Sequence, residues 1–301
     1  MTFTPSYLRL HEEGELKNRI QILIEFMGEC RLCPRECRVN RLKGEVGYCK
    51  AGSEIEISSV FPHFGEEPPL VGHHGSGTIF LTHCNLRCIF CQNYDITHLG
   101  RGETVTASEM ARVMLRLQEM GCHNINFVTP THYVPQIVAS LPEAIEMGLR
   151  LPLVYNCSGY ESIEVIRLLH GIVDIYMPDV KFMNGKYSAK FCNAPDYPEV
   201  IKRILEEMHH QVGDLTFNSD GVAEKGLLIR HLVMPREVAS SEEVLRFIAE
   251  KISINSYVNI MDQYRPEYLA HDHPEINRRT THKEYLEAVQ VARRYHLYRG
   301  F

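Results

Sequence analysis

Three cysteines on one short loop are the residues of this sequence best suited to chemistry. Cys84, Cys88 and Cys91 are separated by three and then two residues, and they directly follow the apolar run 78–82. Thiolates are soft ligands, so three of them can hold three irons of a four-iron four-sulfur cluster. The nearest following cysteine, Cys122, lies 31 positions after Cys91. A cluster with three protein ligands would leave one iron open to a small molecule.

Two other interpretations of this triplet stay open at the level of spacing. The cysteines could be half-buried thiols on a tight turn, or they could belong to a zinc site. Zinc normally takes four protein ligands in a structural site, or three and a water in a catalytic site. We favour the cluster because the loop follows an expected strand, and strand ends commonly carry the chemistry of α/β frameworks.

A second group of cysteines lies upstream within 20 positions. Its members are Cys30, Cys33, Cys37 and Cys49, with Pro34, Gly44 and Gly47 as turn formers between them. Four thiolates could complete a zinc site or a second iron–sulfur cluster, or the thiols could be unligated, and spacing alone does not decide. A cluster here could relay electrons if it lay close to the first.

The whole sequence has the composition of an ordinary globular protein. It has 301 residues, 44% of them hydrophobic and 23% charged, which suffices for one large or two average domains. The net charge of −6 gives no attraction to nucleic acid or an anionic membrane. We find no apolar run of the ~20 residues that a membrane span needs, and no signal-peptide core at the start. We therefore expect a cytoplasmic protein whose ten cysteines bind metal in preference to forming disulfides.

Strand and helix patterns alternate after an N-terminal extension. Helical spacing in 1–29 is followed by the cysteine group and then by loop and short strands in 53–77. Six short apolar runs read as buried parallel strands; they cover 78–82, 125–129, 152–156, 172–177, 228–233 and 257–261. The pattern predicts an α/β fold, a partial (β/α)6 barrel of the TIM type in 77–301, with a cysteine-rich extension in 1–76.

Helix boundaries between these strands carry recognisable signals. Capping boxes are expected where a Ser or Thr precedes a Glu by three residues; the three candidates are Thr106 with Glu109, Ser240 with Glu243, and Thr281 with Glu284. The segment 182–226 is too long for a simple crossover, so we expect an extra helix over 197–212 and a turn near 218–221.

Side chains at the expected strand ends are the candidates for binding a small molecule. The set is Phe90, Thr129, Thr131, Asn156, Ser158, Asp179 and Lys181. Asp179 and Lys181 share one strand face, so they form a buried pair or hold the zwitterionic end of a ligand. Arg230 lies inside an apolar strand and needs a carboxylate partner, internal or bound. His132 is more readily explained as a structural hydrogen-bonding group, and Asp174 as a capping or loop residue.

These features together resemble the radical S-adenosylmethionine (SAM) superfamily. The resemblance is carried by the triplet, by Phe90 before its last cysteine and by the six-strand pattern. The runs 91–95, 177–184 and 228–235 resemble the branch of the pyruvate formate-lyase activating enzyme. A likeness to poorly characterised homologues of that activase spans nearly the whole chain; it includes the Cys33-Pro34 motif and the runs 62–72 and 128–132.

The resemblance implies a mechanism and a set of cofactors. SAM would chelate the open iron of the cluster at Cys84, Cys88 and Cys91, with Phe90 packing against its adenine. One electron would cleave SAM into methionine and a 5′-deoxyadenosyl radical that abstracts hydrogen, while the protein binds and shields the reactants. A ferredoxin or flavodoxin is the usual low-potential donor in such systems.

This sequence also departs from the family pattern in three places. A Gly-Gly-Glu-Pro motif that binds the SAM amino group in many relatives is replaced by the run 129–132, so Thr129 and Thr131 are candidates from position alone. Asn156 stands where the activase has an aspartate of a cation site. The activase lacks the four N-terminal cysteines.

Three functions remain in competition on the sequence. The first is activation of a glycyl radical enzyme. The second is radical modification of another peptide, a nucleotide or a small metabolite. The third is a non-enzymatic iron–sulfur or zinc scaffold. The triplet indicates how a radical would be made but not where it would go.

Overall fold

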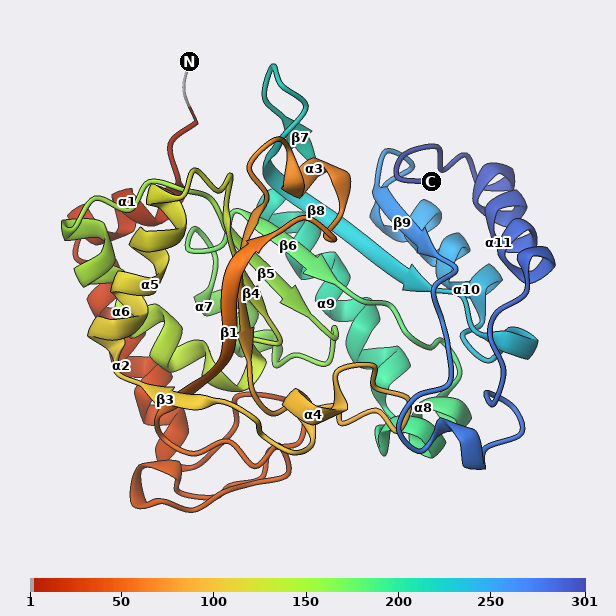
Figure 1. Ribbon diagram of the computed structural model, residues 1–301, viewed down its shortest axis with the longest axis horizontal. Coiled ribbons are helices and arrows are strands. Elements are labelled where there is room, and N and C mark those ends of the chain that lie inside the picture. Colours follow the sequence, from red (N-terminus) through yellow and green to blue (C-terminus); the bar gives the residue numbers. More distant parts are fainter. Residues whose placement is uncertain (1–2) are drawn as a thin grey trace.

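The computed structural model describes residues 3–301, and its centre is a curved sheet of parallel strands (Figure 1). Six strands follow one another in parallel pairings; they are β2 (Ser76–Leu81), β4 (Ile125–Val128), β5 (Leu153–Cys157), β6 (Ile175–Pro178), β8 (Ala223–Leu232) and β9 (Tyr257–Met261). Among the described residues no pairing joins β9 back to the β2 side, so the barrel is open there. The predicted six-strand partial barrel is confirmed.

Continuous burial marks the two strands at the centre of the sheet, β5 and β6. Every residue of β5 and β6 is buried, as expected for strands covered on both faces. The covering helices are α5 (Ala107–Glu119), α6 (Val134–Glu146), α7 (Ile163–Leu168), α8 (Gly185–Cys192), α9 (Tyr197–Val212), α10 (Ser241–Phe247) and α11 (His282–Arg294). Helix α9 confirms the expected extra helix, and the hairpin turn before β8 lies at 218–221, after the short strand β7 (Thr216–Phe217).

Two of the three predicted capping boxes form. The Thr106 and Thr281 side chains each accept the N–H of the glutamate three residues on, and that glutamate bonds back. The prediction for Ser240 is wrong: its side chain makes no cap hydrogen bond, because its φ of 58° is left-handed. A capping side chain needs an extended backbone to reach back to the helix.

The N-terminal part consists of two helices, a cysteine segment and a strand. Helices α1 (Ser6–Glu12) and α2 (Glu15–Gly28) are separated by Gly14, which takes a left-handed φ of 77°. The cysteine segment follows and contains the short helix η1 (Arg41–Lys43). Strand β1 (Ile55–His63) then pairs antiparallel with β2 and with the short β3 (Glu103–Val105).

Strand β1 bears on where the N-terminal extension ends and the barrel begins. Only short strands and loop were expected in 53–77, yet β1 has nine residues and extends the barrel sheet. The short helix α3 (Pro68–Val71) links it to β2, and α4 (Tyr94–Thr97) follows the cysteine triplet. The predicted division into 1–76 and 77–301 falls between two paired strands and stays a prediction. In residues 3–301 we find no helix with the length and apolar character of a membrane span.

Candidate functional site

The cysteine triplet lies on the loop that leaves β2. His83 and Arg87 have φ values of 66° and 49°, so two left-handed bends fold this loop back on itself. Cys84 and Cys88 are buried and Cys91 is partly exposed. The backbone N–H of Leu86 donates to the sulfur of Cys84 over 3.3 Å, a contact that favours a thiolate. The fold therefore presents three sulfurs on one compact turn at the carboxyl end of the sheet.

All three sulfurs line one cavity of about 240 Å³. Six of the seven predicted cofactor-binding residues line it too; they are Phe90, Thr129, Asn156, Ser158, Asp179 and Lys181. The ends of β2, β4, β5, β6, β8 and β9 all contribute to its wall. Gathering at strand ends is how barrels build ligand sites, because loops there converge on one rim.

Thr131 is the predicted residue that the structure places elsewhere. It belongs to η2 (Thr131–Tyr133), is buried, and donates its hydroxyl to Glu161 over 2.8 Å. Tyr155 also donates to Glu161, over 2.9 Å. Burial raises the pKa of Glu161 to about 7, although both hydroxyls oppose the rise. A role for Thr131 in binding a ligand stays a prediction.

A network of charged side chains forms one wall of the cavity. Asp179 accepts from Lys181 Nζ and from Arg230 Nε, each over 2.7 Å, and Arg230 Nη2 donates to Asn156 Oδ1 over 2.7 Å. Burial by itself would raise the pKa of Asp179, but the two cations outweigh it and hold that pKa below its ordinary value. Asp179 is thus the internal carboxylate that Arg230 was expected to need. Glu66 and Glu67 also approach Arg230 Nη1, at 3.8 and 3.6 Å, so carboxylates surround this guanidinium. Lys181 and Arg230 are the cationic donors that the cavity wall offers to an anionic group.

Phe90 combines a packing role with a place on the cavity wall. Its ring packs edge-on against Phe182 and Tyr264, with centroids 5.9 and 6.1 Å away. Only 5% of Phe90 is exposed, and what remains faces the cavity. The two sequence interpretations, core filling and ligand packing, are compatible in this position.

Thr129 holds a strained backbone at the cavity rim. Its φ is 62°, a left-handed value that is uncommon for a β-branched residue. The backbone N–H of Thr129 donates to Asn156 O over 2.8 Å and so helps to fix this conformation. Strain of this kind concentrates at functional sites. A glycine would adopt this conformation at little cost.

Ser158 supplies a direct sign that the cavity is built for a ligand. Its hydroxyl oxygen is buried and has no hydrogen-bond partner within the described chain. A buried hydroxyl without a partner costs free energy, so it is explained best by a polar group that binds in the cavity. Together with the three thiols of the triplet and the cationic groups of Lys181 and Arg230, it fits the predicted four-iron four-sulfur cluster and a small polar ligand.

One thiol close to the triplet was not predicted from the sequence. Cys192, at the end of α8, places its sulfur 3.3 Å from that of Cys88. The two are 104 positions apart, and no spacing motif joins them. Cys192 does not line the cavity, so it approaches Cys88 from behind. The cysteines that line the cavity are the three of the triplet and Cys157 of β5.

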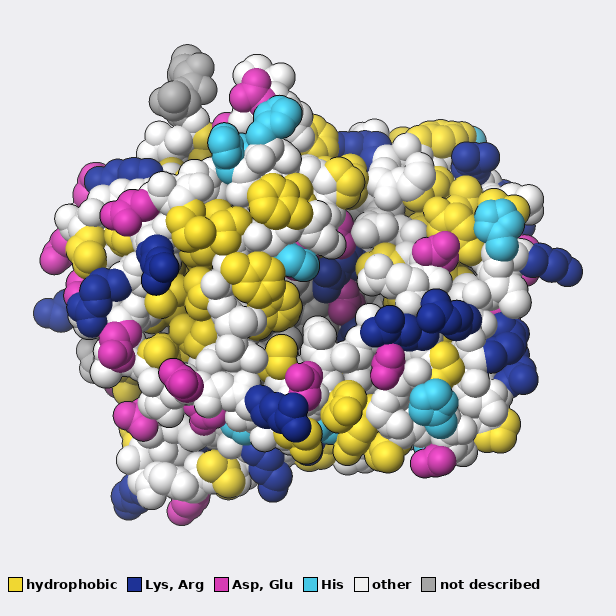
Figure 2. Space-filling view, in the orientation of Figure 1, with side chains coloured by type: hydrophobic (Ala, Val, Ile, Leu, Met, Phe, Trp, Pro, Cys, Tyr) yellow, Lys and Arg dark blue, Asp and Glu magenta, His cyan; other side chains and the backbone are white. Residues whose placement is uncertain are grey.

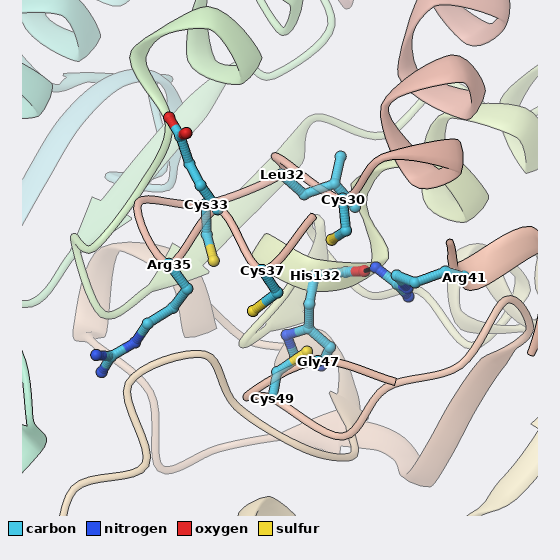
Figure 3. A pocket seen from close by; sticks show the side chains of 10 residues that line it. Cys30, Leu32, Cys33, Arg35, Cys37, Arg41, Gly47, Cys49 and His132 are labelled. Carbon is cyan, nitrogen blue, oxygen red and sulfur yellow. Dashed lines mark hydrogen bonds between the residues drawn. The ribbon is translucent and has the colours of Figure 1, made fainter. Parts of the chain in front are cut away.

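The four N-terminal cysteines surround a second cavity, enclosed by the loops of the cysteine segment (Figure 3). Cys30, Cys33, Cys37 and Cys49 all line it, and their sulfurs point toward a common space. Within residues 3–301 no three histidine, cysteine or acidic side chains are close enough to bind a single metal ion. The same is true of Cys84, Cys88 and Cys91. The observation concerns sites for a single metal ion, and it leaves a cluster of several irons possible at both sets of cysteines.

Two histidines near these sites serve as hydrogen-bonding groups. His132 Nε2 donates to Thr82 O over 2.8 Å, and burial lowers the pKa of His132 to about 3. His231 bonds Val180 O through Nδ1 and the Ser241 hydroxyl through Nε2, over 2.8 and 2.9 Å. The structural interpretation of His132 agrees with this contact. Its Nδ1 atom, however, is buried without a partner.

Comparison with known proteins agrees with the resemblance that the sequence showed. The sequence model of the radical SAM superfamily matches residues 78–248. An uncharacterized protein of Methanocaldococcus jannaschii, MJ0674, is 33% identical over 289 residues, which cover 93% of this chain and 78% of that protein. A second uncharacterized protein of the same organism, MJ0808, is 24% identical over 220 residues, 62% of this chain and 64% of that protein.

Proposed function

From the premise that the chain belongs to the radical SAM superfamily, we propose that it activates a partner protein by creating a glycyl radical. Membership implies an enzyme that cleaves SAM reductively with an iron–sulfur cluster. The non-enzymatic scaffold considered above is therefore set aside. What remains to be proposed is the target of the radical, and a glycine of a protein is the target that the activase-like sequence motifs favour.

The residues of the cavity have separable tasks in this proposal. Cys84, Cys88 and Cys91 hold the cluster, which supplies one electron to SAM when both are bound. Lys181 and Arg230 on the cavity wall bind the SAM carboxylate, and Ser158 offers a hydroxyl to its polar groups. Phe90 packs against the adenine. Burial of the cluster ligands keeps water away from reactive species.

Two departures from the activase limit what is carried over. Asn156 already uses its side-chain oxygen to accept from Arg230, and it lacks the charge of an aspartate. We therefore propose no cation at this position. Thr129 takes the strained turn at the place of a glycine, and its side chain is a candidate contact to the SAM amino group.

A protein partner also needs a way to the cavity. Figure 2 shows a hollow on the face between the β1 side and the β9 side, with charged side chains in it and hydrophobic side chains gathered beside it. Phe61 and Phe64, at the end of β1, are 39% and 63% exposed. Exposed aromatic rings suit an extended peptide as the incoming substrate.

We also propose that the four N-terminal cysteines bind metal, as zinc or as a second iron–sulfur cluster. All ten cysteines of the chain are free, as suits a reducing compartment, and we expect the protein in the cytoplasm. A ferredoxin or flavodoxin would deliver the electrons.

One anaerobic experiment tests the proposed activity. The protein is loaded with iron and sulfide, reduced, and mixed with SAM and a glycyl radical enzyme from the same genome. We expect release of 5′-deoxyadenosine and a persistent protein radical in the EPR spectrum. The matched control is Cys88→Ala, which should abolish both. Release of 5′-deoxyadenosine with no radical on any such partner would favour modification of another peptide, a nucleotide or a small metabolite.

A further inference from the structure

Backbone N–H groups are directed at three of the four N-terminal thiols. The N–H of Tyr48 donates to the Cys37 sulfur over 3.3 Å. Backbone N–H groups of Arg35 and Ala51 likewise favour the thiolates of Cys33 and Cys49, although burial raises the pKa of both thiols. Hydrogen bonds of this kind stabilise the charged form. Thiolates are the form in which cysteine binds metal.

A buried cation beside the thiols lacks an anionic partner. Arg41 is 0% exposed and lines the four-cysteine cavity. Its guanidinium donates to Gly52 O and to His132 O, the latter over 2.7 Å, and in residues 3–301 no carboxylate pairs with it. A buried charge without a counter-charge is costly. Four thiolates around a metal carry net negative charge and would supply the missing partner.

His132 turns an unused nitrogen toward the same cavity. Because Nε2 donates to Thr82 O, the neutral ring carries its proton there, and Nδ1 is a bare lone pair. That atom is buried and bonded to none of the four thiols, although the ring lines their cavity (Figure 3). A histidine whose other nitrogen donates to a backbone carbonyl is the usual arrangement of a metal-ligating histidine. The chain thus offers a fifth donor.

The number of these donors favours a cluster over a single zinc ion. A structural zinc ion draws four ligands to about 2.0–2.3 Å, so its thiols must converge closely. In residues 3–301 no three such side chains converge on one ion, yet all four sulfurs face one cavity. The triplet of the established superfamily site has the same property. A tetrahedral zinc ion uses four donors, whereas the four cysteines and His132 offer five around one cavity.

Two contacts connect this site to the triplet. His132 Nε2 donates to Thr82 O, two residues before Cys84. Arg35, between Cys33 and Cys37, donates through Nε to Asn85 O over 3.1 Å, directly after Cys84. The same guanidinium also bonds Cys192 O over 2.8 Å. The loops that carry the two sets of cysteines are therefore in direct contact.

We propose that Cys30, Cys33, Cys37 and Cys49 hold a second iron–sulfur cluster, faced by His132, that delivers electrons to the cluster at the triplet. In each transfer the second cluster is oxidised by one electron and the first is reduced by one. A low-potential one-electron donor of the ferredoxin or flavodoxin class then reduces the second cluster again. The inference rests on the proposed metal binding by these four cysteines and assumes nothing about the partner protein.

Metal content tests the cluster independently of SAM chemistry. After anaerobic reconstitution we expect about eight irons per chain in the wild type and about four in the triple variant Cys84→Ala/Cys88→Ala/Cys91→Ala. The variant Cys33→Ala/Cys49→Ala should keep about four irons and an EPR change on adding SAM. Cys122→Ala, a buried cysteine outside both sets, is the matched control and should keep about eight. Zinc, or no metal, in the triple variant would overturn the proposal.

The relay is tested by the rate at which the first cluster is reduced. With flavodoxin as the donor, we expect at least a tenfold slower appearance of the first cluster's reduced EPR signal in Cys33→Ala/Cys49→Ala than in the wild type. An equal rate in both proteins would overturn the relay while leaving the second cluster in place. Failure to find a glycyl radical product would affect neither result.

The role of His132 has its own spectroscopic test. His132→Phe keeps a ring but removes both nitrogens, and it is introduced into the triple variant so that only the second site is observed. We expect about four irons to remain, which shows that the site is assembled, and an altered EPR spectrum of the reduced cluster. His132→Gln, which keeps a polar side chain, should shift the spectrum less. Spectra identical to that of the parent triple variant would exclude contact between His132 and the cluster.

Discussion

The sulfur of Cys192, 3.3 Å from that of Cys88, raises the question of whether the first cluster has three or four protein ligands. Thiolates on different irons are held apart by the cluster itself, so a thiol in contact with Cys88 is better placed to donate a hydrogen bond than to bind the open iron. Hydrogen bonds to cluster sulfurs raise the reduction potential. We expect Cys192→Ala to keep the iron of the first site and to lower its potential by on the order of tens of mV in an EPR-monitored titration.

Two comparisons make this prediction specific. Cys88→Ala should lose the iron of the first site, and Cys122→Ala should leave both iron content and potential unchanged. If Cys192→Ala lost as much iron as Cys88→Ala, Cys192 would be a ligand, and the open coordination position of the first cluster would have to be reconsidered.

Glu161 should make stability depend on pH, because its carboxylate is buried and forms no salt bridge within residues 3–301. Burial raises the pKa of Glu161 to about 7 from an ordinary value near 4.5. The folded state therefore binds more protons than the unfolded state between these values, and stability falls as pH rises through this window. Glu161→Gln removes the carboxylate. Its unfolding free energy relative to the wild type should be higher at pH 7.5 than at pH 5.5 by roughly 1–2 kcal/mol.

Urea denaturation at the two pH values measures this difference. Glu164→Gln replaces an exposed glutamate three residues further on and serves as the control, with the same difference from wild type at both values. A pH-independent effect of Glu161→Gln would mean that Glu161 is charged at both pH values, and it would require a cation that the described chain does not place there.

Among the helices, Thr106 and Ser240 both stand at an N-cap, but only Thr106 forms a cap hydrogen bond with its side chain. The two residues therefore allow a matched comparison. Thr106 caps α5 through a reciprocal capping box, whereas the Ser240 side chain makes no cap hydrogen bond to α10. Loss of a working cap costs about 1 kcal/mol. We expect Thr106→Ala to lower the unfolding free energy by about that amount and Ser240→Ala to change it by less than about 0.5 kcal/mol. Equal losses in chemical denaturation would contradict the geometric distinction.

The same pair shows which features of the fold a sequence pattern can predict and which it cannot. Ser240 and Glu243 have the spacing of a capping box, but backbone geometry decides whether the side chain can reach the helix. Arg236, Glu237 and Ser240, which precede the helix, all take left-handed φ values. Strands β5 and β6 were the most predictable, because burial on both faces requires unbroken apolar runs. Strand β1 was harder to find, since it alternates between buried and partly exposed residues and contains Pro62.

The candidate site shows a similar division. Six predicted side chains meet in the cavity because the carboxyl ends of parallel strands share one rim. Thr131 has a suitable position in sequence, but the 3₁₀ turn η2 rotates it toward Glu161. Cys192 comes near Cys88 only through the packing of α8, which no local pattern encodes. The lone pair of His132 depends on a hydrogen bond to a residue 50 positions away.

For the molecule as a whole, the open side of the barrel is bridged by side chains where strand pairing is absent. The loop after β1 carries Glu67, whose Oε1 accepts from Asn259 of β9 over 3.1 Å and lies 3.6 Å from Arg230 Nη1. Glu66 lies 3.8 Å from the same nitrogen. The loop thus joins the N-terminal side of the sheet to its far edge, and it does so through the arginine that also bonds Asp179 at the cofactor cavity.

This bridge predicts a change in dynamics across the opening. Glu67 is 5% exposed, and a hydrogen bond from a neutral group to a buried charge contributes about 1.5–3 kcal/mol. We expect Glu67→Ala to lower the unfolding free energy by about that amount and to speed amide hydrogen exchange in both β1 and β9. Glu67→Gln retains an acceptor for Asn259 and should have a smaller effect on β9. Because the triplet loop lies at the opposite end of β2 from Glu67, iron content should not change. Faster exchange confined to the mutated loop would show that the edges of the barrel are held together by other contacts.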